Sequence, residues 1–435
     1  MRTRAQGVFF GWWIVAGAAG FQLLQNGLLM QAYGTYVAVL REEFGWSTTA
    51  LAAAFSLQRV ESGLLGPLQG WMLDRWGPKI VISAGTVLFG AGFIAFSQIN
   101  SLTTFYVAFI VMAIGASLSG FMSLTTTIVN WFEKRRATAI SLTQVGMSVG
   151  GIMVPLVAWA IVTFGWRPTA FASGIIIIAA GLPLAQLMRH NPEQYDMLPD
   201  GMSLDEKARL DAVRANTAGW VDETVDFTPR QAMRTRAFWF ISLGHMLAVV
   251  VVSAVTVHLV VHLNEGLGFS IGAASVIVAF MTAVTMAGQL VGGFLGDRFN
   301  KRKIATIAMF GHAAGLLALA WGDSLAWVIA FAILHGLAWG MRGPLMQAMR
   351  ADYFGRRSFG QIMGFSSMIV MWGMMSGPII AGLMADRFGN YQYGFTVLAV
   401  MAAFGSIFFA FGTKPTPPAE KRRAERLAAE PAAGD

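Results

Sequence analysis

The chain has 435 residues, of which 55% are of hydrophobic types and 12% are charged. Soluble domains carry about 25% charged residues, so the composition excludes an ordinary soluble protein. The formal net charge of +8 does not indicate a nucleic-acid-binding protein, because the basic residues lie between apolar runs and not on a solvated face with stacking aromatics. The sequence contains no Cys, which excludes disulfides, thiolate metal sites and cysteine catalysis.

Apolar runs separated by charged or turn-forming clusters predict twelve membrane-spanning helices, since twelve spans of about 20 residues fit this length. The first run begins near Val8 and continues without a small-residue cleavage site, which favours a retained span over a secretory signal. The predicted spans are 9–38, 48–72, 80–97, 103–130, 137–163, 168–188, 237–262, 271–295, 303–321, 325–349, 359–384 and 392–412. The predicted fold class is therefore an all-α membrane protein.

The polar segment 190–236 divides the spans into two sets of six. The predicted domains are an N-terminal six-helix bundle (1–189), a connector (190–236), a C-terminal six-helix bundle (237–412) and a basic tail (413–435). Placing the N-terminus in the cytoplasm puts most Lys and Arg on cytoplasmic segments, so the positive-inside rule predicts that both termini and the connector are cytoplasmic. The tail can contact anionic lipid head groups.

Several landmarks recur at one spacing along the chain. Asp74 and Asp297 lie 223 positions apart, as do Pro155 and Pro378. Because this interval holds six spans, an even number, the two halves enter the membrane with the same orientation. The sequence thus predicts a parallel 6+6 pseudo-repeat, which is the architecture of a rocker-type secondary transporter.

The loop after the second span carries the pattern G-x-x-x-D-R-x-G-x-K, and the loop after the eighth span carries a weaker copy. These residues are Gly70, Asp74, Arg75, Gly77 and Lys79, and in the copy Asp297 and Arg298. By this pattern the chain resembles the major facilitator superfamily. The resemblance implies a central cavity lined by spans 1, 4, 7 and 10 that opens alternately to either side, with both loops as conformational latches and Pro155 and Pro378 in kinked gating helices.

Three shorter patterns narrow the resemblance. The sequences GWW at 11–13, NWF at 130–132 and GWR at 165–167 are similar to the bacterial monocarboxylate-porter and oxalate–formate antiporter branch. That branch implies an arginine in the eighth span, at a position where this chain has Gln289. We therefore expect Gln289 to be a neutral substrate contact and another residue to supply the positive charge.

Charges inside the spans are the best functional candidates, because an ionised group at the bilayer centre is costly. On the tenth span Arg342 shares a helix face with His335 and Trp339. Its guanidinium suits a carboxylate and Trp339 suits an apolar portion, so we predict that these three residues bind substrate. The alternative is that Arg342 bonds carbonyls freed near Pro344.

Two further intramembrane charges, Arg59 and Glu61, lie on the second span. Burial favours the protonated form of Glu61, which a proton-coupling carboxyl requires, but a structural ion pair with a neighbouring helix fits equally well. Arg59 shares a face with small residues including Gly66 and Gly70, so we favour an interhelical or gating bond over substrate contact.

Polar side chains mark the other spans expected to line the cavity. We predict substrate contacts from Gln22 and Asn26 on the first span and Asn130 on the fourth, and proton coupling by His245 on the seventh. For each of these, a hydrogen bond between helices is the simpler alternative. His258 and His262 lack a third ligand, so no metal site is predicted.

These residues predict a monomeric, bacterial inner-membrane secondary transporter without a cofactor, and not an enzyme. The leading hypothesis is proton-linked transport of a small organic anion, with Arg342 binding the anion. Its partners are then the small-molecule substrate, protons or another coupling ion, and membrane lipid, with no nucleic acid. The first alternative is export of neutral or amphipathic compounds through an aromatic and Met-rich cavity. The second is a receptor or scaffold that uses the connector as its partner site.

Overall fold

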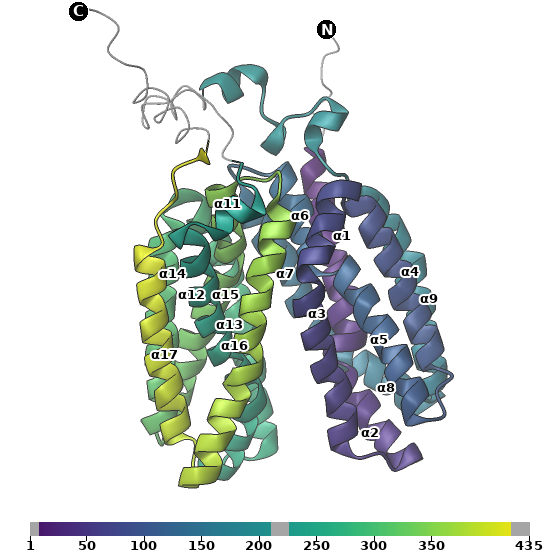
Figure 1. Cartoon of the computed structure of the whole chain (residues 1–435). Helices are drawn as coiled ribbons and strands as arrows, with labels where there is room; N and C mark the ends of the chain where they lie inside the picture. The colour runs from purple at the N-terminus through teal and green to yellow at the C-terminus, as the bar shows by residue number, and fades with distance from the viewer. Residues whose placement is uncertain (1–7, 210–225, 419–435) are drawn as a thin grey trace, which may run out of the picture.

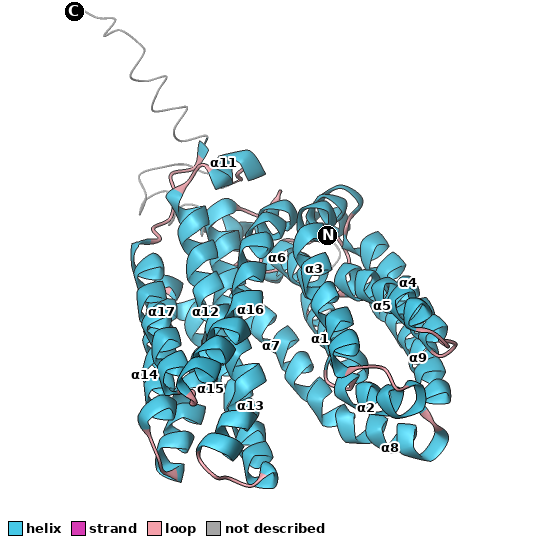
Figure 2. Ribbon diagram, turned by 60° about the horizontal axis from the view of Figure 1, so that its bottom comes forward, coloured by secondary structure: helices cyan, strands magenta, loops and turns pink. Residues whose placement is uncertain are grey.

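The computed structural model describes residues 8–209 and 226–418, and within these ranges every regular element is a helix (Figure 2). The first predicted span consists of α1 (Phe10–Gln25) and η1 (Asn26–Met30), followed by α2 (Tyr33–Phe44), and the second and third are α3 (Thr48–Trp76) and α4 (Pro78–Phe96). The fourth span consists of α5 (Leu102–Ser119) and α6 (Phe121–Trp131), the fifth of α7 (Arg136–Gly150), η2 (Gly151–Met153) and α8 (Val154–Phe164), and the sixth is α9 (Trp166–Leu187). The other six are α12 (Arg236–Val261) with η5 (His262–Gly266), α13 (Ile271–Arg298), α14 (Lys301–Trp321), α15 (Leu325–Phe354), α16 (Phe359–Phe388) and α17 (Gln392–Phe411).

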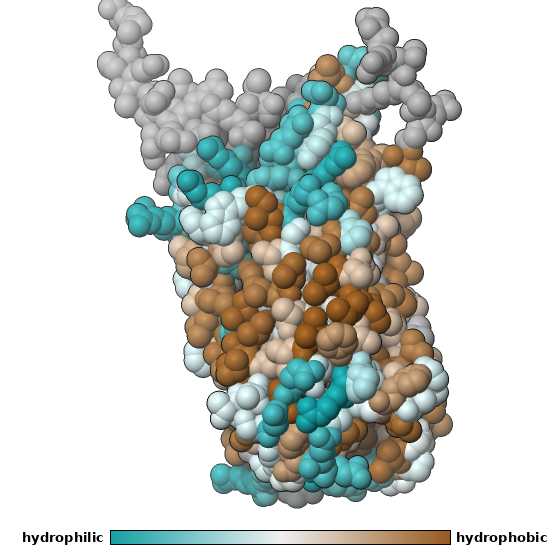
Figure 3. All heavy atoms as spheres, turned by 90° about the vertical axis from the view of Figure 1, so that its right-hand side faces the viewer, coloured by the Kyte–Doolittle hydropathy of each residue, from teal (hydrophilic) through white to brown (hydrophobic). Residues whose placement is uncertain are grey.

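Ten helical segments of the described chain are long and apolar enough to cross a membrane. The two predicted spans outside this set are the first, which the π-helical turn η1 interrupts, and α3, which carries several polar and charged side chains. On the face drawn in Figure 3, apolar residues form a band across the middle, with polar residues above and below it. The chain is a multi-pass membrane protein, as predicted.

The helices gather in two groups, α1 to α9 and α12 to α17 (Figure 1). The groups touch mainly where α3 packs on α16 and α7 packs on α13. Glycines permit the first of these contacts, because a Cβ on Gly70 would lie 2.2 Å from the carbonyl oxygen of Gly360 and one on Gly66 3.0 Å from that of Gly364.

The described residues that connect the two groups along the chain include 188–209 and the short α11 (Pro229–Met233). They lie at one end of the helices, called here the connector end (top of Figure 1). Pro229 occupies the first turn of α11, and Thr228 caps it by accepting a hydrogen bond from the Gln231 N–H. The start of α1 and the end of α17 lie at this same end.

The two repeated prolines have different local structures. Pro155 stands in the first turn of α8, directly after the 3₁₀ turn η2, so the α-helical hydrogen bonding of the fifth span is interrupted there by one tighter turn. Pro378 lies inside the continuous helix α16, and its carbonyl is 2.9 Å from Nε2 of His258. Because proline has no backbone N–H, it fits the first turn of a helix, where that N–H has no partner within the helix. Pro155 occupies such a position in α8.

Candidate functional site

Arg342 lies in the middle third of α15 and is 1% exposed. Its Nε and Nη1 atoms are buried and have no hydrogen-bond partner, and no carboxylate pairs with it in the described chain. The alternative of bonds to carbonyls near Pro344 therefore finds no support at these two atoms. A buried, unpaired guanidinium is unfavourable unless a ligand supplies the missing acceptors.

A second buried arginine on the same helix, Arg350, was missed by the sequence analysis, which ended the span at residue 349. Helix α15 continues to Phe354, and Arg350 is 2% exposed. Its Nη1 donates to Oε1 of Gln347 (3.0 Å) and to a backbone carbonyl, and its Nε and Nη2 donate to Oγ of Ser366 (3.0 and 2.7 Å). All of these acceptors are neutral, so the positive charge of Arg350 is uncompensated among the residues described.

His245 of α12 completes the bonding of Arg350, whose Nη2 lies 3.0 Å from Nδ1 of the imidazole. Because a guanidinium only donates hydrogen bonds, Nδ1 must accept and the ring proton must sit on Nε2. A second proton on Nδ1 would face the arginine cation directly. This geometry disfavours a proton-carrying role for His245, which stays a prediction.

The remaining predicted residues of the Arg342 face differ in position. His335 is fully buried, and its Nδ1 lies 3.2 Å from Nδ1 of His312, which belongs to α14. Trp339 is half-buried, with its ring centroid 6.3 Å from that of His335. His335 of α15 therefore contacts α14 through Nδ1, while its Nε2 is buried without a partner in the described residues, and its substrate contact stays a prediction.

Glu61 is bonded by hydroxyl groups of α3 and α5. Its Oε2 accepts from Oγ of Ser62 (3.0 Å) and Oγ of Ser117 (2.9 Å), while Oε1 is buried without a partner. No basic side chain of the described residues pairs with it, which disfavours the structural ion pair. The side chain of Arg59, predicted to have a gating role, lies outside the described part of the structure.

The polar candidates of the first and eighth spans are buried. Nδ2 of Asn26 donates to the backbone carbonyl of Gln22 (3.3 Å), and Nε2 of Gln22 has no partner. Oε1 of Gln289 accepts from Oγ of Ser148 at 3.3 Å, which joins α13 to α7 across the two helix groups. Gln22 thus retains a free amide donor, whereas Gln289 takes part in the contact between the groups.

Asn130 lies at the connector end and not beside Arg342. Its Nδ2 donates to the carbonyl of His190 (3.1 Å), and its own carbonyl accepts from Nη1 of Arg356 (3.0 Å). Arg356 also pairs with Glu193. Asn130 therefore links the two helix groups through Arg356, and its substrate contact stays a prediction.

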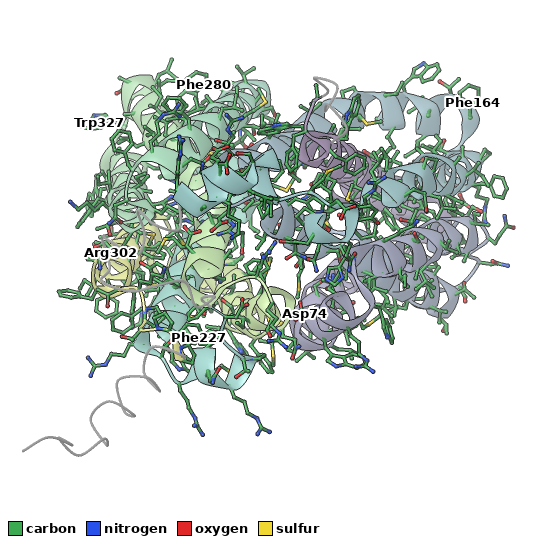
Figure 4. The ribbon with its side chains drawn as sticks, turned by 90° about the horizontal axis from the view of Figure 1, so that it is seen from above. Asp74, Phe164, Phe227, Phe280, Arg302 and Trp327 are labelled. Carbon is green, nitrogen blue, oxygen red and sulfur yellow. The ribbon has the colours of Figure 1, made fainter. Side chains whose placement is uncertain are left out.

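Two aspartates cap helices of the opposite group at the connector end. Oδ1 and Oδ2 of Asp74 accept from the N–H groups of Gly360 and Gln361, both at 3.1 Å, at the start of α16. Oδ1 and Oδ2 of Asp297 accept from those of Ala137 (2.8 Å) and Thr138 (3.0 Å) at the start of α7. Negative charge is favourable at a helix N-terminus. Figure 4 shows Asp74 where the two groups meet.

An ion pair between Arg136 of α7 and Asp352 of α15 also joins the two helix groups at the connector end. By contrast, Arg75, Lys79 and Arg298 are exposed, and the guanidinium of Arg298 lies 3.5 Å above the ring of Phe294 in its own helix. Gly77 joins α3 to α4 with a φ of +79°, which a residue with a Cβ adopts only with strain. Among these loop residues, the aspartates carry the hydrogen bonds between groups.

The family profile described as Major Facilitator Superfamily matches residues 19–286 and 241–433. The MFS transporter asaE of Aspergillus flavus is 25% identical over 319 residues, which cover 70% of this chain but only 64% of that protein. Human monocarboxylate transporter 11 is 26% identical over 83% of this chain and 75% of its own length. The oxalate:formate antiporter of Oxalobacter formigenes is 22% identical over 76% and 74%.

Among solved structures, the proton:xylose symporter XylE bound to 6-bromo-6-deoxy-D-glucose matches with a TM-score of 0.71 at 15% identity, over 93% of this chain and 96% of that one. At this identity the likeness shows the fold alone.

Proposed function

The chain belongs to the major facilitator superfamily, and we propose that it is a secondary transporter of a small organic anion. The family and its relatives are transporters and not enzymes. The observation that carries the proposal is Arg342, a buried guanidinium with two unpaired nitrogens and no carboxylate partner among the described residues. Two of the similar proteins are named for carboxylate anions, monocarboxylate in one and oxalate with formate in the other, which agrees with such a site.

The proposed architecture is a parallel 6+6 pseudo-repeat, with bundles at 1–189 and 237–412. The reciprocal contacts of Asp74 and Asp297, called here the crosswise caps, support this architecture. In each of them an aspartate of one bundle caps the start of a helix in the other bundle. Rocking of the two bundles about a site between them would then expose that site to one side at a time.

We assign the connector end to the cytoplasm, because it carries the basic loops of the sequence. Among the described residues, the hydrogen bonds between the two helix groups lie at the connector end, and the one farthest from that end is the contact of Gln289 with Ser148. The structure then corresponds to a conformation closed on the cytoplasmic side. In this scheme Asp74, Asp297 and the ion pair of Arg136 must separate before the substrate reaches the cytoplasm.

Arg342→Gln tests the proposed function, with Arg298→Gln as the control that removes an exposed arginine. A ligand at 100 times its dissociation constant stabilises the folded state by about 2.7 kcal/mol, so thermal unfolding of the purified protein can screen carboxylates, sugars and amphipathic compounds. We expect carboxylates to stabilise the wild type and Arg298→Gln, and to have no effect on Arg342→Gln. Stabilisation by amphipathic compounds alone, or equal carboxylate binding by Arg342→Gln, would contradict the proposal and favour the exporter.

A further inference from the structure

Arg350 is buried and its hydrogen-bond partners are all neutral, which bears on how many negative charges the substrate carries. We propose that Arg350 and His245 form a second arm of the anion site, with the imidazole Nε2–H as a neutral donor, and that the preferred substrate is a small organic dianion. This inference rests on the proposed function and adds the substrate class to it.

The first step is the charge balance around α15. Arg342 and Arg350 are eight residues apart on one helix, which is a rise of about 12 Å along its axis. No carboxylate among the described residues pairs with either guanidinium. A monoanion bound at Arg342 would leave one buried positive charge uncompensated, whereas a dianion compensates both.

The second step is the hydrogen-bonding capacity of Arg350. A guanidinium has five N–H donors, and the neutral acceptors of Ser366, Gln347, Met346 and His245 account for five directions. Arg350 therefore has no donor left for a ligand. It acts as a positioning residue: it holds His245 through Nδ1, and its positive charge lies on the side of the ring away from Nε2.

The third step is the free end of the imidazole. His245 is partly exposed, and no described residue accepts a hydrogen bond from its Nε2. With Nδ1 accepting from Arg350, Nε2 carries the ring proton and presents an N–H donor. Helix α12 packs against α15, and Ser242 of α12 bonds Ser366 at 2.8 Å, so the same cluster fixes the helix that carries His245.

The geometry thus combines two kinds of donor. Arg342 offers charged N–H groups for one acidic group, and His245 offers a neutral N–H for the second, with Arg350 behind it. Charge-assisted hydrogen bonds are about twice as strong as neutral ones, so Arg342 is the main anchor and His245 selects for the second group.

The test compares matched anions on the purified full-length protein by isothermal titration calorimetry at pH 7.5. Formate, acetate and butyrate serve as monoanions, and oxalate, malonate and succinate as dianions. We expect at least one dianion to bind more tightly than every monoanion by about tenfold, or 1.4 kcal/mol. Monoanions that bind as tightly as all the dianions would overturn this inference but not the proposed function, whereas a wild type that binds neither class contradicts the proposed function itself.

Two substitutions at His245 separate its two nitrogens. His245→Gln keeps an amide N–H near the place of Nε2, and His245→Asn keeps only an acceptor near the place of Nδ1 for Arg350. We expect dianion binding to survive in His245→Gln and to fall about tenfold in His245→Asn, with a smaller loss for monoanions, which Arg342 anchors. Equal dianion affinity in the two variants would show that the Nε2–H makes no contact with the ligand.

Arg350→Gln then tests the positioning charge directly. The shorter glutamine lacks both the positive charge and the Nη2 contact to His245, so the ratio of dianion to monoanion affinity should fall towards one while Arg342 still binds monoanions. A ratio equal to that of the wild type would overturn the role of Arg350. The ¹⁵N chemical shifts of labelled His245 give an independent readout, since the wild type should show the Nε2–H tautomer between pH 5 and 8.

Discussion

Glu61 differs from Arg342 and Arg350 because it is an acid, and its hydrogen-bond partners among the described residues are all hydroxyl groups. Two serines donate to one carboxylate oxygen, and the other oxygen has no partner. A protonated carboxyl can use that second oxygen as a donor, whereas an ionised one leaves it unsatisfied in an apolar interior. This arrangement suits a group that alternates between the two forms, which is why we propose Glu61 as the proton carrier.

Glu61→Gln should uncouple transport from protons. The amide can accept from Ser62 and Ser117 as the carboxylate does, so the helix contact is kept while the titration is lost. We expect anion exchange in proteoliposomes to persist and uptake driven by a pH gradient to fall by about tenfold or more.

Ser117→Ala is the matched control, because it removes one hydroxyl and leaves the carboxyl. It should retain gradient-driven uptake with an altered pH profile. If Glu61→Gln transports along a pH gradient as well as the wild type does, the proton is carried elsewhere.

At the scale of the residue, sequence reasoning identified Arg342 but not Arg350 or the state of His245. Hydropathy ended the tenth span one residue before Arg350, since an apolar window cannot show that a helix stays buried past its apolar run. The tautomer of His245 follows only from its contact with an arginine 105 positions away. Spacing also placed Asn130 and His335 on plausible faces, but their neighbours at the connector end and on α14 come from tertiary packing.

At the scale of the helix, the two crosswise caps are the main polar contacts between the groups. Each aspartate accepts two backbone N–H groups of a helix start, which stabilises the contact by both hydrogen bonding and the helix dipole. The loop motif predicted a latch, and its aspartates do contact the opposite group. Its exposed cations, Arg75 and Lys79, could not be assigned a partner from sequence.

Asp74→Asn should shift the conformational equilibrium towards opening of the connector end. The amide retains one acceptor but loses the charge, and such a change at a helix N-terminus is worth about 0.3–1 kcal/mol. Because the chain has no Cys, spin labels can be placed at Lys79→Cys and Lys303→Cys without removing native thiols. We expect electron–electron distance measurements to show a larger long-distance population in Asp74→Asn.

The control for this measurement is Asp323→Asn, which changes an exposed aspartate in the loop between α14 and α15. Its distance distribution should match that of the wild type. An unchanged distribution in Asp74→Asn and in the double variant with Asp297→Asn would show that the caps do not hold the groups together.

At the scale of the whole molecule, the sequence predicted the all-helical membrane fold, because each span is a long apolar run with short loops. It could not predict how the groups meet. The contact of α3 with α16 depends on Gly66 and Gly70 facing Gly364 and Gly360. The shared spacing of Pro155 and Pro378 did not reveal that a 3₁₀ turn precedes Pro155, whereas α16 continues through Pro378.

Arg342 and Arg350 of α15, which have no carboxylate partner among the described residues, also have an electrical consequence. An empty carrier that reorients would move the charge of Arg342 and Arg350 through part of the transmembrane voltage, whereas a carrier loaded with a dianion would be nearly neutral in this region. One elementary charge crossing 100 mV is worth about 2.3 kcal/mol, so the empty return step should respond to voltage more than the loaded step does. Currents recorded on solid-supported membranes would reveal this, and a voltage-insensitive empty carrier would show that other charges compensate. The protein would then work more readily as an exchanger of anions than as a one-way carrier.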